Sequence, residues 1–461
     1  MRKLVRGGTV VTATHSSVAD VLIDGEEITA LGALGDVDAE VIDAGGCYVL
    51  PGLIDNHTHM AMPFGGTNSI DDYDTGTRAA AAGGTTCIVD FVIQQHPGGL
   101  RSSLEEWSDR AAGAAHVDYG FHIAITQADE GTFADMKPMV EAGICTFKVF
   151  LAYKDVLMVP DDLFLRVLES TRDLGALTMV HAENGWAIDV LVERALAAGQ
   201  TDPIHHARTR PEVLEAEATH RSVRLAELAG AGVYIVHVTC GLAADEIAAG
   251  QSRGVDVSGE TCLQYLTNTV DDLERPDFEG ARYVCSPPLR EARNQELLWA
   301  ALDRGVLESV STDHCPFNSD QKALGRDDFS KIPNGLAMIQ HRLVKLWDLG
   351  VETGRITPEE LVNMTSTAIA KRFGLARKGA IAPGKDADLV VFDPATPFEF
   401  STRTSHMNVD YDLFEGQTST GSVRQTFCRG ELVYDRGEIR TQPGHGRFVP
   451  RSLGAPAPVA S

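Results

Sequence analysis

Histidine, lysine and aspartate residues recur at the ends of short apolar runs along the chain, where they are suited to binding a metal ion. His57 and His59 stand two positions apart, so on a strand their side chains point to the same side and can bind one ion together. One further candidate stands on each of four later runs: Lys148, His181, His237 and Asp313. Imidazole and carboxylate ligands together suit zinc or a similar divalent transition ion. The pattern therefore predicts a metal site.

An ordinary structural role is the alternative for each of these residues. A lone strand histidine is more often a core or surface group than a ligand, and an isolated pair leaves the question open. Six such residues at strand ends are harder to explain in this way, because burying them without partners costs free energy. The neighbours of Lys148 in the run 147–150 are apolar, which disfavours a lysine that extends to the surface.

Other histidines and cysteines near the same strand ends are interpreted as structural. His314 follows Asp313 directly, so we expect it to point to the opposite side of the strand. Cys240 and Cys315 could bind metal through thiolate, but neither has a paired cysteine, and packing in the wall is the favoured role. The histidines without partners at ligand spacing are 205, 206, 220, 341, 406 and 445.

Eight short β-rich runs carry these candidates, and most are separated by stretches with apolar residues at helical spacing. The runs are 53–59, 85–92, 119–126, 146–152, 177–183, 233–239, 255–262 and 309–314. Such an alternation predicts an α/β fold, a (β/α)8 TIM-like barrel whose strand ends meet at one mouth. An open doubly wound sheet is the alternative, but the chain contains neither a GxGxxG fingerprint nor a P-loop.

The two ends of the chain differ from the middle in having short strands and turn signals without helical stretches between them. Residues 1–50 and 384–447 are therefore predicted to form one small β-sandwich domain built from both termini. The barrel is assigned to residues 51–383. Residues 448–461, rich in Pro, Ala and Ser, are predicted to form a flexible tail.

Composition excludes several classes of partner for this chain of 461 residues. Its 40 Lys and Arg against 65 Asp and Glu give a net charge of −25, which repels nucleic acid and anionic membrane surfaces. No run of about 18 uncharged apolar residues is present to span a membrane. The eight cysteines form no CxxC pair, which is typical of a reducing compartment. We therefore expect a cytoplasmic protein.

Two segments resemble the amidohydrolase superfamily. Residues 51–59 (PGLIDNHTH) are similar to its opening metal motif, and residues 386–392 (DADLVVF) are similar to the strand on which the chain re-enters the small β domain. Asn56 departs from the family pattern, and we expect it to face away from the histidine pair.

Further motifs resemble the dihydropyrimidinase and D-hydantoinase branch of this superfamily over almost the whole chain. They are residues 62–66 (MPFGG), 146–154 (TFKVFLAYK), 181–184 (HAEN), 283–290 (YVCSPPLR), 311–317 (STDHCPF) and 331–335 (KIPNG).

The resemblance implies two divalent metal ions per chain, zinc in the first place, with manganese or cobalt as alternatives. It implies that Lys148 is carboxylated on its side-chain nitrogen and bridges the ions. One ion would take His57, His59, Lys148 and Asp313, and the other would take Lys148, His181 and His237. Two cations would repel a protonated lysine strongly, whereas a carbamate is an anion.

The activity implied is hydrolysis of a ring amide in 5,6-dihydropyrimidines or 5-substituted hydantoins, which gives N-carbamoyl amino acids. Asp313 would transfer the proton to the leaving nitrogen, and Tyr153 would donate a hydrogen bond to the developing oxyanion. Ser286 and Asn334 match positions that hold the ring of this small cyclic ureide. The residues expected to contact the ring substituent are Met62, Phe64, Phe150 and Leu157. The family also implies a homotetramer.

Three alternatives stay open at this point. Dihydroorotase relatives hold a substrate carboxylate with a cationic residue soon after the histidine pair, whereas residues 60–64 (MAMPF) are uncharged here. Allantoinase is the other enzymatic alternative. A non-catalytic scaffold of the same fold is a third, although such relatives have lost metal ligands and this chain keeps all six.

Overall fold

Eight parallel strands form the centre of the computed structural model, which describes residues 2–127 and 129–454. The strands are β6 (Leu53–Thr58), β9 (Thr85–Ile93), β10 (Asp118–Ala124), β11 (Thr146–Phe150), β12 (Leu177–His181), β13 (Val233–Ile235), β14 (Val257–Cys262) and β15 (Ser309–Ser311). Almost every residue in them is buried, as expected of parallel strands covered on both faces.

These strands follow one another in the order β15-β14-β13-β12-β11-β10-β9-β6. A parallel bridge between Thr58 and His314 brings the two ends of this sheet together, so the barrel is nearly closed. The predicted (β/α)8 barrel is therefore confirmed. All eight carboxyl ends of the strands meet at one mouth.

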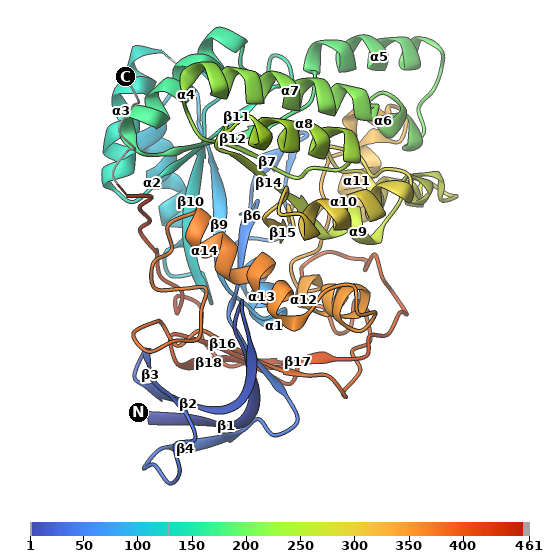
Figure 1. Cartoon of the computed structure of the whole chain (residues 1–461). Helices are drawn as coiled ribbons and strands as arrows, with labels where there is room; N and C mark the ends of the chain where they lie inside the picture. The colour runs from blue at the N-terminus through green and yellow to red at the C-terminus, as the bar shows by residue number, and fades with distance from the viewer. Residues whose placement is uncertain (1, 128, 455–461) are drawn as a thin grey trace.

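Helices surround the barrel and connect its strands (Figure 1). The longer ones are α1 (Thr75–Ala82), α2 (Leu100–Ala111), α3 (Glu130–Glu141), α4 (Asp161–Leu174), α5 (Gly185–Ala197), α7 (Glu212–Ala229), α8 (Gly241–Ser252) and α10 (Arg293–Asp303). The shorter ones are α6 (Ile204–Arg208), α9 (Leu263–Thr267), α11 (Ser319–Lys322), α12 (Arg342–Leu346), α13 (Pro358–Val362) and α14 (Ala368–Arg372).

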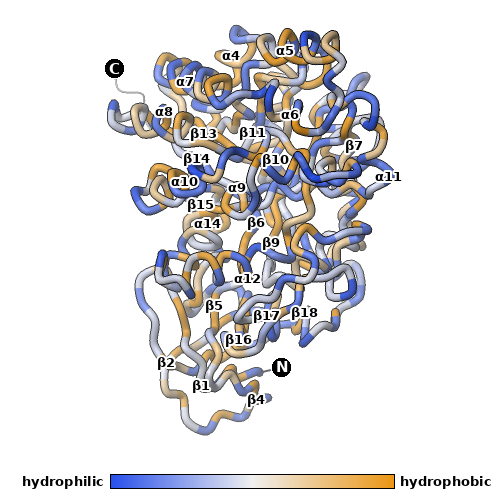
Figure 2. Tube along the Cα trace, turned by 90° about the vertical axis from the view of Figure 1, so that its right-hand side faces the viewer, coloured by the Kyte–Doolittle hydropathy of each residue, from blue (hydrophilic) through white to orange (hydrophobic). Residues whose placement is uncertain are grey.

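Helix α4 illustrates how the sequence specifies these helices. Asp161 and Asp162 lie in its first turn, where carboxylates interact favourably with the helix dipole. Phe164, Val167 and Leu168 lie on its buried face, and Gly175 ends the helix in the left-handed conformation at φ 61°. Along the chain trace, hydrophilic and hydrophobic segments alternate in the helices around the barrel (Figure 2).

A mixed sheet built from both ends of the chain lies below the barrel in Figure 1. Its strands are β1 (Arg2–Val11), β2 (Ser16–Asp24), β3 (Glu27–Gly32), β4 (Glu40–Asp43), β5 (Tyr48–Pro51), β16 (Leu389–Asp393), β17 (Ser422–Cys428), β18 (Glu431–Asp435) and β19 (Glu438–Ile439). The antiparallel pairing of β5 with β16 joins the N-terminal and C-terminal parts. A small β-rich part made from both termini was predicted and is present.

Buried charges connect this sheet to the barrel. The Lys378 ammonium, 1% exposed, lies 2.7 Å from carboxylate oxygens of both Asp118, at the start of β10, and Asp388, just before β16. Removing one partner of such a buried group is strongly destabilising, so the contact fixes the sheet against the barrel.

In the part of the chain that the structure describes, no helix combines the length and the hydropathy needed to cross a membrane.

The segment that precedes the C-terminus differs from the predicted flexible tail. Residues 455–461 lie outside the described residues. Before them, Val449 donates its backbone N–H to Tyr119 O at 2.7 Å, and Arg451 is only 3% exposed. The Arg451 guanidinium donates to Thr146 Oγ1 at 2.8 Å beneath the barrel. Composition alone suggested a loose segment, but these hydrogen bonds hold residues 448–454 against the barrel.

Candidate active site

The predicted metal ligands lie at the carboxyl ends of five barrel strands. His57 is on β6 and His59 follows it, Lys148 is on β11, and His181 ends β12. His237 and Asp313 follow β13 and β15 by two residues each. All six are buried, none being more than 8% exposed.

Contacts among these side chains are short. Lys148 Nζ lies 3.1 Å from His57 Nε2. Asp313 Oδ1 lies 3.1 Å from the same nitrogen and 3.0 Å from His59 Nε2. His181 Nδ1 lies 2.8 Å from His237 Nε2. The structure therefore brings all six predicted ligands into one cluster.

The donor set of this cluster fits divalent metal ions. One ligand atom from each of His57, His237 and Asp313 lies within 4.8 Å of the other two. Among the described residues, the buried Nδ1 atoms of His59 and His237 have no hydrogen-bond partner. Burial lowers the pKa of His57 and of His237 well below the usual value, which leaves the neutral imidazole that metal binding requires.

The Asp313 carboxylate supplies negative charge to this centre. Burial opposes its ionisation, but its contacts with His57 and His59, including the hydrogen bond from His59, outweigh burial and lower its pKa to about 2. Asp313 is therefore ionised at neutral pH, as a ligand for a cation must be.

Two further carboxylates lie behind the histidines and orient them. His57 Nδ1 lies 2.5 Å from Glu260 Oε1, so Nε2 of the same ring faces the centre. His181 Nε2 lies 2.8 Å from Glu183 Oε2, so its Nδ1 faces the centre. A carboxylate behind a ligating histidine fixes the ring and raises its basicity. Sequence analysis did not identify Glu260, although a glutamate in the buried strand β14 is a signal that a partner is needed.

Asn56, which was expected to face away from the histidine pair, supports the site indirectly. Its side-chain amide donates a hydrogen bond to Glu260 Oε2, and Tyr234 donates to the same oxygen at 3.2 Å. Asn56 thus contributes to the hydrogen bonds that hold the carboxylate behind His57.

Lys148 is enclosed by aromatic rings as well as by ligands. It is 1% exposed, and its Nζ lies 4.2 Å from the ring centroid of Phe91 and 4.8 Å from that of Phe150. Burial lowers the pKa of Lys148 to about 8, although the charges of Asp313 and Glu260 oppose the shift. An uncharged amine is therefore accessible near neutral pH.

Three residues at the mouth adopt the left-handed backbone conformation, which is uncommon outside glycine. They are Tyr153 at φ 65°, His237 at φ 41° and Asp313 at φ 48°. Such local strain is held by the surrounding structure and gathers at functional sites. The carboxyl ends of the strands therefore turn sharply to direct these side chains at the mouth.

A cavity of about 640 Å³ opens above the cluster. Every residue predicted to contact substrate lines it: Met62, Phe64, Phe150, Tyr153, Leu157, Ser286 and Asn334. His59, Lys148, His181, His237 and Asp313 lie at its inner end. Ile93, Arg210 and Ile332, which sequence analysis did not identify, also line the cavity.

The Tyr153 side chain stands between the apolar wall and the histidines. Its ring centroid lies 5.4 Å from that of Phe64 and 5.3 Å from that of His181. Burial, with the charge of Glu183, raises the pKa of Tyr153 above its usual value. The hydroxyl is therefore protonated at neutral pH and able to donate a hydrogen bond into the cavity.

His206 does not line the cavity but contacts Ser286, which does, so it has a supporting structural role behind the site. It is 1% exposed, and its Nε2 lies 3.0 Å from Ser286 Oγ. Its Nδ1 accepts a hydrogen bond from Arg210 at 3.2 Å. Ser286 also accepts from the Asn334 side-chain amide at 3.0 Å. No motif marks His206, because its partner lies 80 residues away in the chain.

His314 and Cys315 have the structural positions expected of them. His314 Nε2 lies 2.9 Å from Asp71 Oδ2, on the side away from the ligand cluster, and its Nδ1 accepts the backbone N–H of Met338 at 3.1 Å. Cys315 packs in the cavity wall with Met62 and Phe317.

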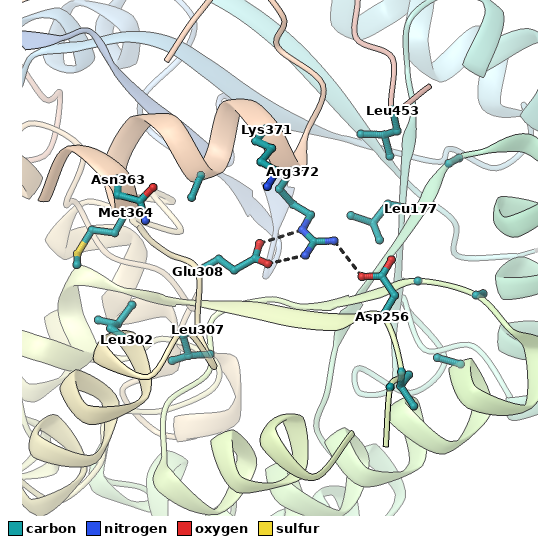
Figure 3. A pocket seen from close by; sticks show the side chains of 18 of the residues that line it. Leu177, Asp256, Leu302, Leu307, Glu308, Asn363, Met364, Lys371, Arg372 and Leu453 are labelled. Carbon is teal, nitrogen blue, oxygen red and sulfur yellow. Dashed lines mark hydrogen bonds and ion pairs between the residues drawn. The ribbon is translucent and has the colours of Figure 1, made fainter. Parts of the chain in front are cut away.

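A larger cavity, of about 1260 Å³, lies at the opposite end of the barrel strands (Figure 3). The Arg372 guanidinium contacts Glu308 at 2.5 Å and Asp256 at 3.2 Å within it. These side chains form ion pairs with one another, and none of the predicted metal ligands lines this cavity. The smaller cavity at the mouth is therefore the candidate active site.

Known proteins resemble this chain over nearly its full length. Residues 48–433 match the amidohydrolase family. The chain is 49% identical to a D-hydantoinase of Geobacillus stearothermophilus, over 98% of this chain and 97% of that protein. It is 44% identical to a dihydropyrimidinase of Arabidopsis thaliana, over 97% and 85%. The crystal structure of a dihydropyrimidinase from Brevibacillus agri matches with a TM-score of 0.97 at 50% identity, over 98% of this chain and 99% of that one.

The carboxylate behind His57 leads to a prediction about metal binding. Glu260→Gln keeps the side-chain shape but removes its charge, so zinc should bind about 10–100-fold more weakly. Competition with a chromogenic chelator measures this affinity. Glu246→Gln removes a surface carboxylate 2.7 Å from His220 and is a matched control that should bind zinc normally. Unchanged affinity in Glu260→Gln would remove Glu260 from the metal site.

Proposed function

The chain belongs to the amidohydrolase family, and we propose that it opens the ring amide of 5-substituted hydantoins and 5,6-dihydropyrimidines. The products are N-carbamoyl amino acids. One observation carries the proposal: six buried ligand candidates form one cluster, and five of them line a cavity whose wall is otherwise mostly apolar. The relatives named D-hydantoinase and dihydropyrimidinase support the same reaction class.

Two divalent ions, zinc in the first place, are assigned to the cluster. His57, His59, Lys148 and Asp313 would hold one ion. Lys148, His181 and His237 would hold the other. When bound, such ions supply a hydroxide nucleophile near neutral pH.

Lys148 is assigned the role of the shared ligand, as a carbamate on Nζ. Its uncharged amine attacks the carbon of CO₂, a C–N bond forms, and one proton leaves to solvent. The product is an anion with two oxygens. Support comes from the burial of Lys148 and from its position 3.1 Å from His57 Nε2, where a protonated amine would repel cations.

Asp313 and Tyr153 are assigned to proton transfer and to oxyanion stabilisation. Asp313 uses Oδ1 for both histidine contacts, so we assign Oδ2 to accept the nucleophile's proton and deliver it to the ring nitrogen. The Tyr153 hydroxyl donates to the carbonyl oxygen as negative charge develops there. Its raised pKa keeps the proton needed for this donation.

Ring recognition is assigned to two groups of residues that line the cavity. Ser286 and Asn334, joined by a 3.0 Å hydrogen bond, present polar groups to the ring amide and the second carbonyl. Phe64, Phe150 and Leu157 surround the place left for a ring substituent. This division favours an uncharged ring with an apolar 5-substituent.

Two broader features are also inferred, a homotetramer and a cytoplasmic location. The tetramer rests on the family resemblance. The location is supported by the eight cysteines, all of which are buried and unpaired within the described residues.

Ring opening by purified protein tests the proposed function. Zinc-loaded protein should convert 5-phenylhydantoin or dihydrouracil to the N-carbamoyl product, detected by mass spectrometry, and should contain about two ions per chain. Prolonged chelation should abolish turnover, and zinc, cobalt or manganese should restore it. Full activity in metal-free protein, or no opening of any ring, would contradict the proposal.

The oxyanion role of Tyr153 gives a second prediction. Tyr153→Phe removes the hydroxyl and keeps the ring, so kcat should fall about 100-fold or more while metal content stays unchanged. Steady-state kinetics and metal analysis measure the two quantities. Tyr48→Phe, whose ring packs on Trp347 away from the cavity, should retain wild-type kcat. A Tyr153→Phe enzyme within about twofold of wild type would exclude this role.

A further inference from the structure

Lys322, at the end of the single-turn helix α11, is a buried cation that does not line the active-site cavity. It is 1% exposed. Its Nζ donates to three backbone carbonyls: Val284 O at 2.9 Å, Pro333 O at 2.7 Å and Gly335 O at 2.9 Å. A lysine ammonium has three N–H donors, so each donor has one acceptor. All three N–H donors of the side chain therefore bind carbonyls of two neighbouring loops.

Those two loops carry the residues assigned to the ring. Val284 precedes Ser286 by two positions, and Pro333 and Gly335 lie on either side of Asn334. Gly335 also donates its backbone N–H to Val284 O at 3.0 Å. The ammonium thus lies behind the point where the two ring-binding side chains meet.

Helix α11 also contacts the third segment of the cavity wall. The Gln321 side-chain amide donates to Thr67 Oγ1 at 2.7 Å and to Asn68 O at 2.8 Å. Thr67 and Asn68 form the strand β8, which pairs with β7 (Pro63–Phe64). One helical turn therefore connects the hairpin of Phe64 with the loops of Ser286 and Asn334.

We propose that Lys322 is a positioning residue for substrate binding, whose ammonium fixes the separation of the Ser286 and Asn334 loops. The proposal rests on the proposed function, because it needs these two side chains to hold the ring. Without the ammonium, the carbonyls of Pro333 and Gly335 lose their donor in a buried place, Val284 O keeps only the Gly335 N–H, and the loops separate to reach water. A small displacement of positioning groups has a large effect on binding and rate.

Lys322→Met tests this role. KM for 5-phenylhydantoin should rise about tenfold or more, kcat should change less, and zinc content should stay at the wild-type value, because the lost contact acts on ring binding. Lys345→Met is the matched control: Lys345 is also buried, but its ammonium donates to Gln417 Oε1 at 2.7 Å and does not line the cavity. KM of this control should equal that of wild type.

Chemical rescue separates positioning from general stability. In Lys322→Ala, n-propylammonium should lower KM toward the wild-type value with increasing concentration, whereas the uncharged 1-propanol should not. If Lys322→Met does not fold, KM can be measured on Lys322→Gln instead, because its amide keeps two N–H donors for the buried carbonyls.

The possible failures are distinguishable. A wild-type protein that opens no ring overturns the proposed function, and this inference with it. An active wild type together with an unchanged KM in the folded Lys322 variants overturns the inference alone. If 1-propanol rescues KM as effectively as the amine does, the side chain of Lys322 acts only by its volume, and the positioning role of its ammonium is wrong.

Discussion

The approach of Lys148 Nζ to His57 Nε2, at 3.1 Å in a place closed to water, is the contact on which the arrangement of the active site depends. Neighbouring metal ions would make a protonated amine unfavourable at this place. An anionic form of Lys148 would remove this problem. It would also explain why a lysine, rather than a carboxylate, stands on a strand lined with aromatic rings, since the added group would lengthen the side chain.

The barrel supplies the rigid support that this contact needs. Each ligand stands at the end of a buried strand, and the two carboxylates of Glu260 and Glu183 hold His57 and His181 in the ring orientation that faces the centre. Glu260 is itself held by Asn56 and Tyr234. The groups that would touch substrate lie instead on loops and on a short hairpin, which is the usual division between scaffold and binding surface in this fold.

The sequence was sufficient to predict the eight strands and the convergence of the six candidate side chains, because both follow from local patterns: apolar runs of strand length and polar residues at their ends. Contacts between distant segments were not accessible in this way. Lys322 binds backbone carbonyls of residues 11 to 38 positions away. Every residue has a backbone carbonyl, so residue types do not indicate which ones will bind a lysine. The C-terminal segment was misjudged for the same reason, since the contacts of Arg451 decide its position and its Pro and Ala content does not.

Carbon-13 NMR can detect a carbamate on Lys148. Metal-free protein is reconstituted with zinc in ¹³C-bicarbonate and then exchanged into unlabelled buffer. We expect one carbamate carbon signal per chain that is retained with bound zinc, lost when the metal is removed, and absent in Lys148→Ala. Active protein with two zinc ions per chain and no retained ¹³C signal would show that Lys148 does not act as a carbamate.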